Sequence, residues 1–366
     1  MSPRLGLVVG VLMLTSRAAL AFCPSYTPKE TAGGQNCGVD PAPGTNPTIP
    51  QWNLVFAKVA PGKASWLTDG PSIGDIGSGC GKPNPPTTVP AHFPCHVLKS
   101  IAMVETGWRQ FCVPDTPAAS VGAPERTIIS FDCGYGIGQV TSGMHVGENP
   151  SFDRQRVVSE PTYNLATGTL ILAGKWGATK CVGDNNPDVV EDWYTAIWAY
   201  NGLAYSNNPS NPNLTPGRGV YNPSNGGSYT YQEKVLGWME HPSANRWTSL
   251  AVAYPNRADV GGSGAPPDLP EPSCDSPTDC TKTRIVHASV CDGVPMMDAG
   301  VPPKDASVPP GVDAASPPPP NPDASTAPNG AASADGGCSC REGSSTPSAS
   351  WLFLAFVMLG TRRRKR

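Results

Sequence analysis

A glutamate at the end of an apolar segment is the first residue of this chain that could do acid–base chemistry. Residues 97–111 read VLKSIAMVETGWRQF, and Glu105 follows, at helical spacing, the apolar residues Leu98, Ile101 and Ala102. On a helix this spacing puts the Glu105 carboxyl in line with the stripe that faces the core. Burial disfavours the charged carboxylate and raises its pKa. Glu105 could therefore hold a proton near neutral pH and donate it to a leaving oxygen.

Three short motifs follow Glu105-Thr106 in chain order: GYGIGQV at 134–140, YNLATG at 163–168 and AYNG at 199–202. Taken together, the four pieces resemble the soluble lytic transglycosylases and goose-type lysozymes of the lysozyme-like superfamily. In that family a helix ends in Glu-Ser, a Gly-Leu-Met-Gln-like loop follows, a later helix carries Asn and Gly, and an Ala-Tyr-Asn-Gly turn comes last. The resemblance covers roughly residues 89–239, in which YTYQEKVLG is similar to a late helix that bears a tyrosine.

The resemblance implies an enzyme and a reaction. Glu105 would be the catalytic acid of a peptidoglycan lytic transglycosylase, which cleaves the β-1,4 bond between N-acetylmuramic acid and N-acetylglucosamine. Thr106 takes the place of the family's serine and keeps its hydroxyl. Peptidoglycan or a related N-acetylated glycan would be the partner, and no cofactor is implied.

The resemblance also implies which residues bind the sugar chain. Tyr200 would orient the acid, and Asn201 would contact an N-acetyl group. The substrate-binding set is completed by Thr106 and by four residues of the loop, Gly136, Ile137, Gly138 and Gln139. Glycines in such a loop allow its backbone to approach a ligand closely.

One departure from the family leaves the reaction outcome open. Tyr135 lies thirty positions after Glu105, and the intervening insert holds Cys112, Asp132 and Cys133. A Cys112–Cys133 disulfide would close the insert into a loop beside the cleft and could bring Asp132 near the acid. Two carboxyl groups would allow hydrolysis by water. Glu105 alone would require the substrate's own N-acetyl group or 6-hydroxyl as nucleophile, which gives a 1,6-anhydro product.

Two alternatives to a lyase follow from these residues. If Asp132 is a second catalytic carboxyl group, the chain is a lysozyme- or chitinase-like hydrolase, whereas Asp132 could equally be an ordinary surface-loop residue. The second alternative, from another functional class, is a non-catalytic glycan-binding surface protein. Such a protein would have no need to keep Glu105, Gln139, Tyr200 and Asn201 together, so their presence argues against it.

Charge and histidine placement argue against other classes. Residues 22–258 hold 17 acidic and 15 basic residues, and residues 259–337 hold 11 and 3. The chain thus lacks the basic patch of a nucleic-acid-binding protein. His92 and His96 flank Pro94 without a nearby third ligand, so we expect no metal site there. We expect the domain to act as a monomer.

Both ends of the chain look like targeting segments. Residues 1–21 have an arginine, an apolar run and Ala19-Leu20-Ala21, which is typical of a cleaved secretory signal peptide. Residues 338–366 contain Cys338-Ser339-Cys340, a short apolar segment and TRRRKR. This set resembles the C-terminal sorting tags called MYXO-CTERM, and the resemblance implies a processing protease as a partner and anchoring at the cell surface or outer membrane. A plain tail anchor is the alternative.

Composition and periodicity predict what lies between these ends. Residues 22–258 should form a mainly α domain, which the resemblance makes lysozyme-like, with long loops that carry disulfides. Helices are expected at 49–60, 97–106, 187–201 and 230–241, and another with Asn164 as its N-cap. Seven cysteines fall in this domain, so one is free or pairs outside it. Residues 259–337 are rich in Pro, Ala and Asp and should be a disordered linker with a small cluster of Cys274, Cys280 and Cys291.

Overall fold

Helices supply most of the regular structure in the computed structural model, which describes residues 37–113, 125–212, 221–224, 229–243 and 246–276 together with residues 280 and 291. The α-helices are α1 (Ile49–Val59), α2 (Lys63–Trp66), α3 (Cys95–Thr106), α4 (Arg154–Ser159), α5 (Pro161–Ala178), α6 (Tyr194–Tyr200), α7 (Tyr231–Glu240) and α8 (Arg257–Val260). Short 3₁₀ turns cover Glu191–Trp193 and Tyr205–Asn207. The prediction of a mainly α domain is confirmed at this level.

Strands are few and short in the described residues. Strand β1 (Ile76–Ser78) pairs antiparallel with β2 (Thr87–Val89), and β3 (Phe111–Cys112) pairs antiparallel with β4 (Arg126–Thr127). Each pair forms a two-stranded sheet. The second pair joins the chain just after α3 to the far end of the insert, so it holds the two sides of the insert together.

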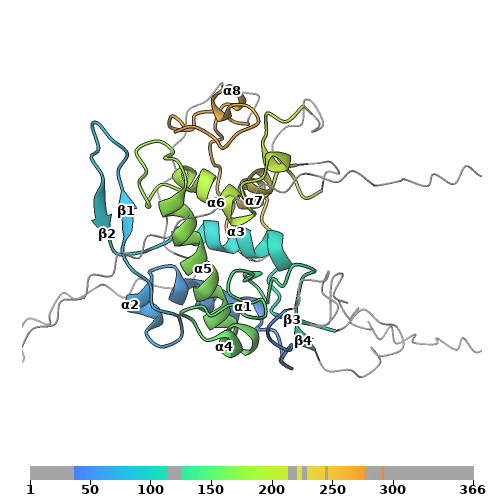
Figure 1. The fold of residues 1–366 in the computed structure, drawn as a ribbon. Helices are drawn as coiled ribbons and strands as arrows, with labels where there is room; N and C mark the ends of the chain where they lie inside the picture. The colour runs from blue at the N-terminus through green and yellow to red at the C-terminus, as the bar shows by residue number, and fades with distance from the viewer. Residues whose placement is uncertain are drawn as a thin grey trace, which may run out of the picture. The chain divides into compact units, whose positions relative to one another are not determined.

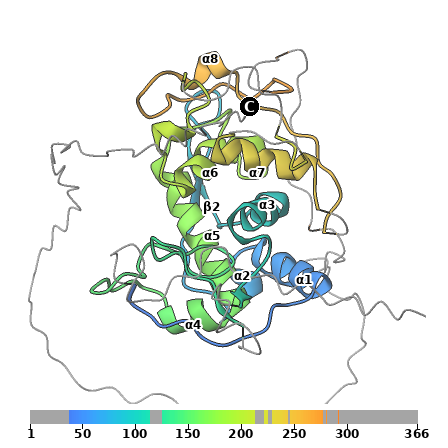
Figure 2. The same cartoon turned by 90° about the vertical axis from the view of Figure 1, so that its right-hand side faces the viewer.

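Helix α3 lies at the centre of the arrangement (Figures 1 and 2). It packs against α7 and α1, while α5 packs against α6, α4 and α1. Figure 2 shows α7 directly above α3, with α5 beside both. The helix that ends in the candidate acid is therefore surrounded by the helices that carry the other motifs.

The boundaries of α3 match the sequence expectation, whereas those of α5 do not. Gly107 ends α3 in the left-handed conformation at φ 64°, which glycine adopts without steric cost. Helix α5 begins at Pro161 with Glu160 as N-cap, so the prediction that Asn164 caps this helix is wrong. Proline suits the first helical turn because its missing N–H would have no partner there. Asn164 instead lies one turn inside α5 and is fully buried.

Tryptophans fill the space between the helices. Trp108, Trp193 and Trp198 are at most 2% exposed, which confirms that they belong to the core and are not open sugar platforms. Trp176 contacts Trp193 with ring centroids 4.2 Å apart. A second, smaller apolar cluster lies under the 129–144 loop and includes Tyr135.

Disulfides join distant parts of the chain. The described pairs are Cys37–Cys133, Cys80–Cys181, Cys95–Cys291 and Cys274–Cys280. Cys112 is also disulfide-bonded, but not to Cys133, so the Cys112–Cys133 bridge considered from the sequence does not form. Cys95 pairs with Cys291, which lies outside residues 22–258, and this is one of the two outcomes that the odd count allowed.

The folded part continues past the predicted boundary at residue 258. Val260, Leu269 and Cys274 are at most 3% exposed, and Leu269 forms a β-bridge with Val182. Residues 259–276 therefore pack onto the helical domain, and the expectation that the linker begins at 259 is wrong for this segment. Composition alone gave the wrong start for the linker, because a few buried side chains and backbone hydrogen bonds are enough to hold a proline-rich segment on the helical domain.

Several predictions concern residues that the structure does not describe. The signal peptide at 1–21, the linker after 291 and the C-terminal tag at 338–366 lie outside the described residues. Among the described helices, none has the length and apolar character needed to cross a membrane.

Candidate active site

Glu105 meets a tyrosine from the other end of the domain. The Tyr231 hydroxyl, on the first residue of α7, donates a hydrogen bond of 2.5 Å to Glu105 Oε1. Packing of α7 on α3 makes this contact possible across 126 positions of sequence. While Tyr231 donates to Oε1, a proton carried by Glu105 resides on the other oxygen, Oε2.

The surroundings of Glu105 favour its protonated form. Burial raises the pKa of Glu105, the Tyr231 hydrogen bond lowers it, and the negative charge of Asp132 raises it again. The resulting pKa is about 7. A carboxyl group with this pKa is largely protonated just below neutral pH. The sequence-based expectation of a desolvated acid therefore agrees with the geometry, since Leu98, Ile101 and Ala102 are all buried on the same side of α3.

Tyr200 lies beside the acid but does not hold it. Its hydroxyl donates to Gly138 O at 2.5 Å, so it fixes the loop, while Tyr231 takes the orienting role that the resemblance gave to Tyr200. Burial, followed by the charge of Glu105, raises the pKa of the Tyr200 phenol above its usual range, which shows that the two groups are close. A Cβ on Gly168 would come within 2.9 Å of the Tyr200 hydroxyl, so glycine is needed there.

Two buried amide side chains hold the 136–138 loop in place. Gln110 Oε1 accepts from Ile137 N at 2.8 Å, and Asn164 Oδ1 accepts from Gly138 N at 2.8 Å. Gly136 has φ 63°, and a Cβ there would lie 2.1 Å from Gln110 Oε1. The loop is therefore rigid, and its glycines let the amides reach its backbone.

Ile137 and Gln139 of this loop differ in what they offer a ligand. Ile137 is fully buried, so only its backbone can contribute to the cleft. Gln139 is partly exposed, and its Nε2 donates to Gly136 O at 2.9 Å. Among residues 136–139, Gln139 is thus the one whose side chain is partly exposed.

Thr106 is a positioning residue in this arrangement. It is 7% exposed, and its hydroxyl accepts from Arg109 N at 3.2 Å while lying 3.5 Å from Ile137 O. The hydroxyl thus links the end of α3 to the loop, and the expectation that Thr106 contacts substrate has no exposed group to support it.

Asn201 is exposed at the end of α6 and connects to the acid through a second asparagine. Asn207 Nδ2 donates to Asn201 Oδ1 at 2.7 Å, and Asn207 Oδ1 accepts from Tyr231 N at 3.2 Å. The AYNG turn and the start of α7 are therefore fixed together. A ligand that displaces Asn201 would therefore also disturb the start of α7, which carries Tyr231.

Asp132 lies close enough to influence Glu105, but it is held by its own loop. Its Oδ1 accepts from Ser130 Oγ at 2.5 Å, and its charge raises the pKa of Glu105 as the third contribution after burial and Tyr231. The next residue, Cys133, ties this loop to Cys37 rather than to Cys112. The insert thus places a second carboxylate near the acid by a route other than the expected disulfide.

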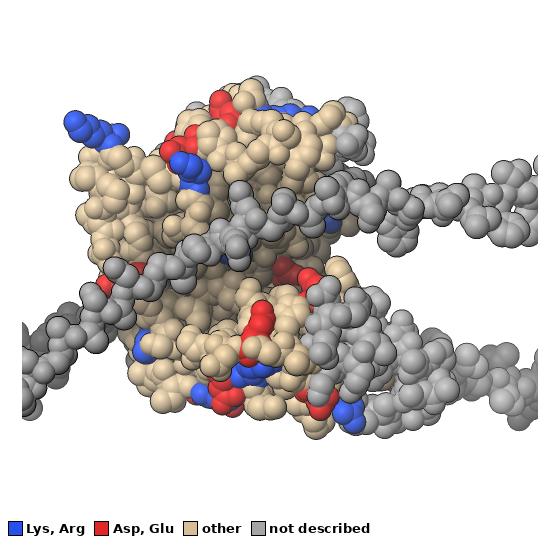
Figure 3. Space-filling model, in the orientation of Figure 1, with Lys and Arg blue, Asp and Glu red and all other residues tan. Residues whose placement is uncertain are grey.

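A groove runs from the end of α3 and carries two arginines. Its lining residues are Pro47, Ile49, Trp52, Gly107, Trp108, Arg109 and Arg246. Arg246 lies 5.4 Å from the centroid of the Trp108 ring, and neither arginine pairs with a carboxylate among the described residues. In the space-filling view the described surface is hollowed at the level of α3 (Figure 3). The groove offers positive charge and aromatic surface within a few residues of Glu105.

Four residues of this site were absent from the predicted set: Tyr231, Asn164, Gln110 and Asn207. Tyr231 and Asn164 stood within the motifs YTYQEKVLG and YNLATG, so their position in those motifs was the available signal. Gln110 and Asn207 carried no sequence signal, because their roles depend on contacts with loops distant in the chain.

Comparisons with known proteins do not decide the function. No family model, curated protein or solved structure matches this chain. The arrangement of its own side chains is therefore the basis for a function.

Tyr231→Phe should shift the pH dependence of any activity that uses Glu105 as an acid. The Tyr231 hydrogen bond lowers the pKa of Glu105, so its loss should raise that pKa and move the alkaline limb of the kcat/KM profile to higher pH, by about one unit. Tyr200→Phe is the matched control, because its hydroxyl bonds to Gly138 and not to the acid. The kcat/KM profile should be measured from about pH 5 to about pH 9, around the ordinary operating pH. If the alkaline limb does not move in Tyr231→Phe, Tyr231 does not tune the pKa of Glu105.

Proposed function

We propose that this chain is a peptidoglycan lytic transglycosylase of the lysozyme-like superfamily, with Glu105 as its single catalytic acid. The observation that carries the proposal is the half-buried Glu105 carboxyl, whose pKa burial raises to about 7 and whose Oε1 is held by Tyr231. The ordered loop of Gly136, Gly138 and Gln139 lies beside it, and the partly exposed Gln139 is the side chain of this loop that a sugar chain could meet.

The residues support a two-step reaction without a cofactor. In the first step Glu105 gives its proton to the glycosidic oxygen, and the bond from that oxygen to the sugar's anomeric carbon breaks as the N-acetyl oxygen or the 6-hydroxyl approaches. In the second step the 6-hydroxyl oxygen bonds to the anomeric carbon and returns its proton to the Glu105 carboxylate. The acid is restored, and the product carries a 1,6-anhydro end.

The two arginines of the groove favour peptidoglycan over chitin as the substrate. Peptidoglycan bears carboxylates on its lactyl groups and peptide stems, whereas chitin is neutral. Arg109 and Arg246 present guanidinium groups that match carboxylates. We infer that the groove receives the anionic part of the glycan while Glu105 acts on its backbone.

A digest analysed by mass spectrometry tests the proposed function. The purified protein should release fragments with 1,6-anhydro ends from peptidoglycan and should leave chitin uncut. Reducing ends would show a hydrolase, and no fragments from either polymer would show a glycan-binding protein.

Asp132→Asn separates the lyase from the hydrolase in the same digest. A lyase that relies on the substrate's own groups should keep its rate within about threefold, because Asp132 neither donates nor attacks; a hydrolase that uses Asp132 to activate water should lose about 10²-fold or more. Ser130→Ala is the matched control, since it removes the hydrogen bond to Asp132 and keeps the carboxylate. A 10²-fold loss in Asp132→Asn with reducing-end products would overturn the single-acid mechanism.

The ends of the chain suggest where the enzyme works. We infer export through the signal at 1–21, followed by cleavage and anchoring at the tag at 338–366 by a processing protease. Disulfides in the folded part agree with an oxidising compartment. A form that lacks 338–366 should appear in the medium, and a truncated form that stays with the membrane would contradict the anchoring role.

A further inference from the structure

Three carboxyl groups meet on the side of the domain formed by the loop before α6. Asp184 lies in that loop, Asp192 in the 3₁₀ turn that leads into α6, and Glu271 in the segment that follows α8. One carboxylate oxygen of each lies within 4.8 Å of the others. The three residues take no part in the site around Glu105.

Backbone pairing explains why the groups converge. Gly183 N donates to Leu269 O at 3.1 Å, and Leu269 N donates to Cys181 O at 2.9 Å. This short parallel ladder fixes residues 181–183 beside residue 269, so Glu271 must come next to Asp184. The convergence is a feature of the fold and does not depend on exposed, freely moving side chains.

One buried carboxylate oxygen of Asp192 has no hydrogen-bond donor. The residue is 1% exposed, its Oδ2 accepts from Asn186 N at 2.6 Å, and its Oδ1 receives no hydrogen bond from the described residues. Glu271 Oε1 is also buried without a donor, while the Glu271 carboxyl as a whole interacts with the Asp184 backbone N–H and the Asp192 side chain. A buried carboxylate oxygen without a donor is costly, so these two oxygens need a proton or a cation.

The space beside Asp192 Oδ1 and the other Glu271 oxygen, Oε2, is kept free of carbon. Gly183 has φ 57°, and a Cβ there would lie 2.0 Å from Glu271 Oε2 and 2.8 Å from Asp192 Oδ1. No lysine or arginine of the described residues forms an ion pair with the three carboxyl groups.

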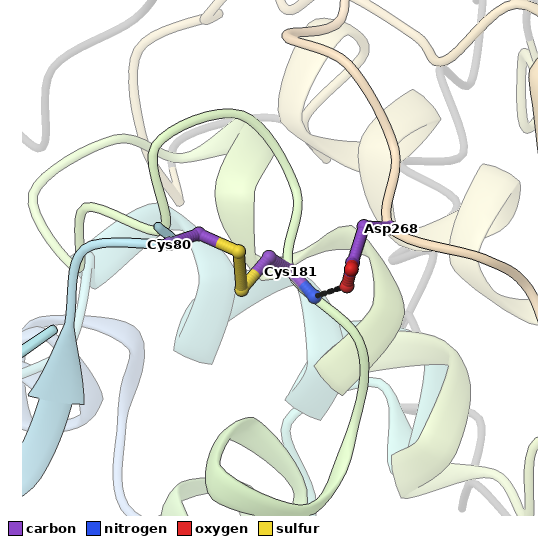
Figure 4. Close-up of side chains that lie close together, drawn as sticks. All are labelled: Cys80, Cys181 and Asp268. Atoms are coloured by element: carbon purple, nitrogen blue, oxygen red, sulfur yellow. Dashed lines mark hydrogen bonds between the residues drawn. A yellow bond between two sulfur atoms is a disulfide. The ribbon is translucent and has the colours of Figure 1, made fainter. Parts of the chain in front are cut away.

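In a neighbouring cluster, the atoms that could bind a metal already have partners within the protein. Cys80, Cys181 and Asp268 also bring potential ligand atoms together (Figure 4). There, the two sulfurs are joined in a disulfide, and Asp268 Oδ1 accepts from Cys181 N at 2.9 Å. Those atoms have partners and cannot serve as thiolate ligands. The carboxylate cluster differs because its buried oxygens remain without donors.

We propose that Asp184, Asp192 and Glu271 form a structural calcium site that joins the loop before α6 to the segment after α8. Calcium prefers oxygen ligands, accepts carboxylates singly or in pairs, and tolerates irregular geometry with waters that complete its shell. Magnesium would fit less well, because it requires near-ideal octahedral geometry. Bound calcium would hold residues 268–271 on the domain and brace the start of α6, whose other end carries Tyr200 and Asn201.

Thermal melting of the full-length protein tests the site. After treatment with a chelator, the addition of CaCl₂ should raise Tm by roughly 5–10 °C at a concentration about 100 times Kd, and calorimetry should show one bound ion. MgCl₂ at the same concentration should give a smaller shift. No shift and no heat of binding with CaCl₂ would overturn the proposal and would assign a shared proton to the cluster instead.

Asp192→Asn and Asp188→Asn form a matched pair. Asp192→Asn keeps the shape of the side chain but offers calcium a neutral amide oxygen in place of a carboxylate, so it should lose the calcium-dependent shift. Asp188 lies in the same loop but pairs with His92 at 2.8 Å, so Asp188→Asn should keep the shift. Glu271→Gln, assayed by calorimetry, gives a second reading if Asp192→Asn does not fold. Calcium binding by Asp192→Asn or Glu271→Gln with wild-type affinity would contradict the assignment.

Discussion

Glu105→Gln should abolish cleavage of peptidoglycan and leave glycan binding nearly unchanged. Gln has almost the same shape, so the packing of α3 should hold, and its amide can still meet the Tyr231 hydroxyl. It cannot give a proton to the glycosidic oxygen. General acid catalysis contributes about 10²–10⁴-fold in rate, and a sole acid should lie at the upper end of that range. The rate of fragment release and the Kd for a glycan oligomer, measured on the same preparation, check both halves of this prediction.

The same substitution should also raise stability at alkaline pH. Because the folded-state pKa of Glu105 is about 7 against an ordinary 4.5, the folded chain holds this proton more tightly than the unfolded chain does. The wild type therefore loses stability as pH rises from about 4.5 to about 7, by at most about 3 kcal/mol, since the side chain is not fully enclosed. Glu105→Gln lacks this loss, so it should melt above the wild type at high pH. The two proteins should melt at the same temperature near pH 4, which is about half a unit below the ordinary pKa of Glu.

The cleavage assay decides the catalytic role. If Glu105→Gln keeps more than about a tenth of wild-type cleavage, Glu105 is not the acid.

A chain that ends at residue 258 should be severely destabilised. It would lose the buried side chains of Val260 and Leu269 and would leave Cys95 without its partner Cys291. Fully burying a Val or Leu contributes about 1.5–3 kcal/mol, and a native disulfide about 2–5 kcal/mol. The combined loss is on the order of 5 kcal/mol or more, a large share of the ordinary stability of a domain. Urea denaturation of the oxidised proteins would measure it.

A chain that ends at residue 301 is the control for this truncation. It keeps Cys291 and all residues that the structure describes, and it removes only the rest of the predicted linker and the tag. Its free energy of unfolding should equal that of the longer chain within about 0.5 kcal/mol. Equal stability of the 258 and 301 forms would show that residues 259–291 are not part of the folded unit.

Local patterns predicted the helix that carries the acid but not the group that holds it. The apolar spacing before Glu105 and the glycine after Thr106 are enough to predict where α3 runs and where it ends. The contact with Tyr231 depends on α7 packing across α3, and no periodicity within either helix specifies that packing. The sequence motif could say that a tyrosine-bearing helix belongs to the site, yet it assigned the orienting role to Tyr200.

The errors in the sequence analysis have physical causes. Asn164 was taken for an N-cap because asparagine often caps helices, but Pro161 starts the helix earlier and frees the amide to hold Gly138. Disulfide partners depend on the folded geometry, so Cys133 pairs with Cys37 and not with the nearer Cys112. The linker was placed too early because average composition does not register single buried residues such as Leu269.

The Cys95–Cys291 disulfide changes how the protein would bear a mechanical load. A pull on the two ends of the chain would pass through this bond, which closes a loop with a sequence separation of 196 residues. Fully stretched, that loop would span on the order of 650 Å, none of which can extend while the bond is intact. Glu105, Asn164, Tyr200 and Tyr231 all lie inside the loop. If the protein is anchored at one surface and holds a glycan mesh, as proposed, a pull on its ends would leave most of this loop unstretched, while the Cys37–Cys133 and Cys80–Cys181 disulfides would pass part of the load to residues inside it.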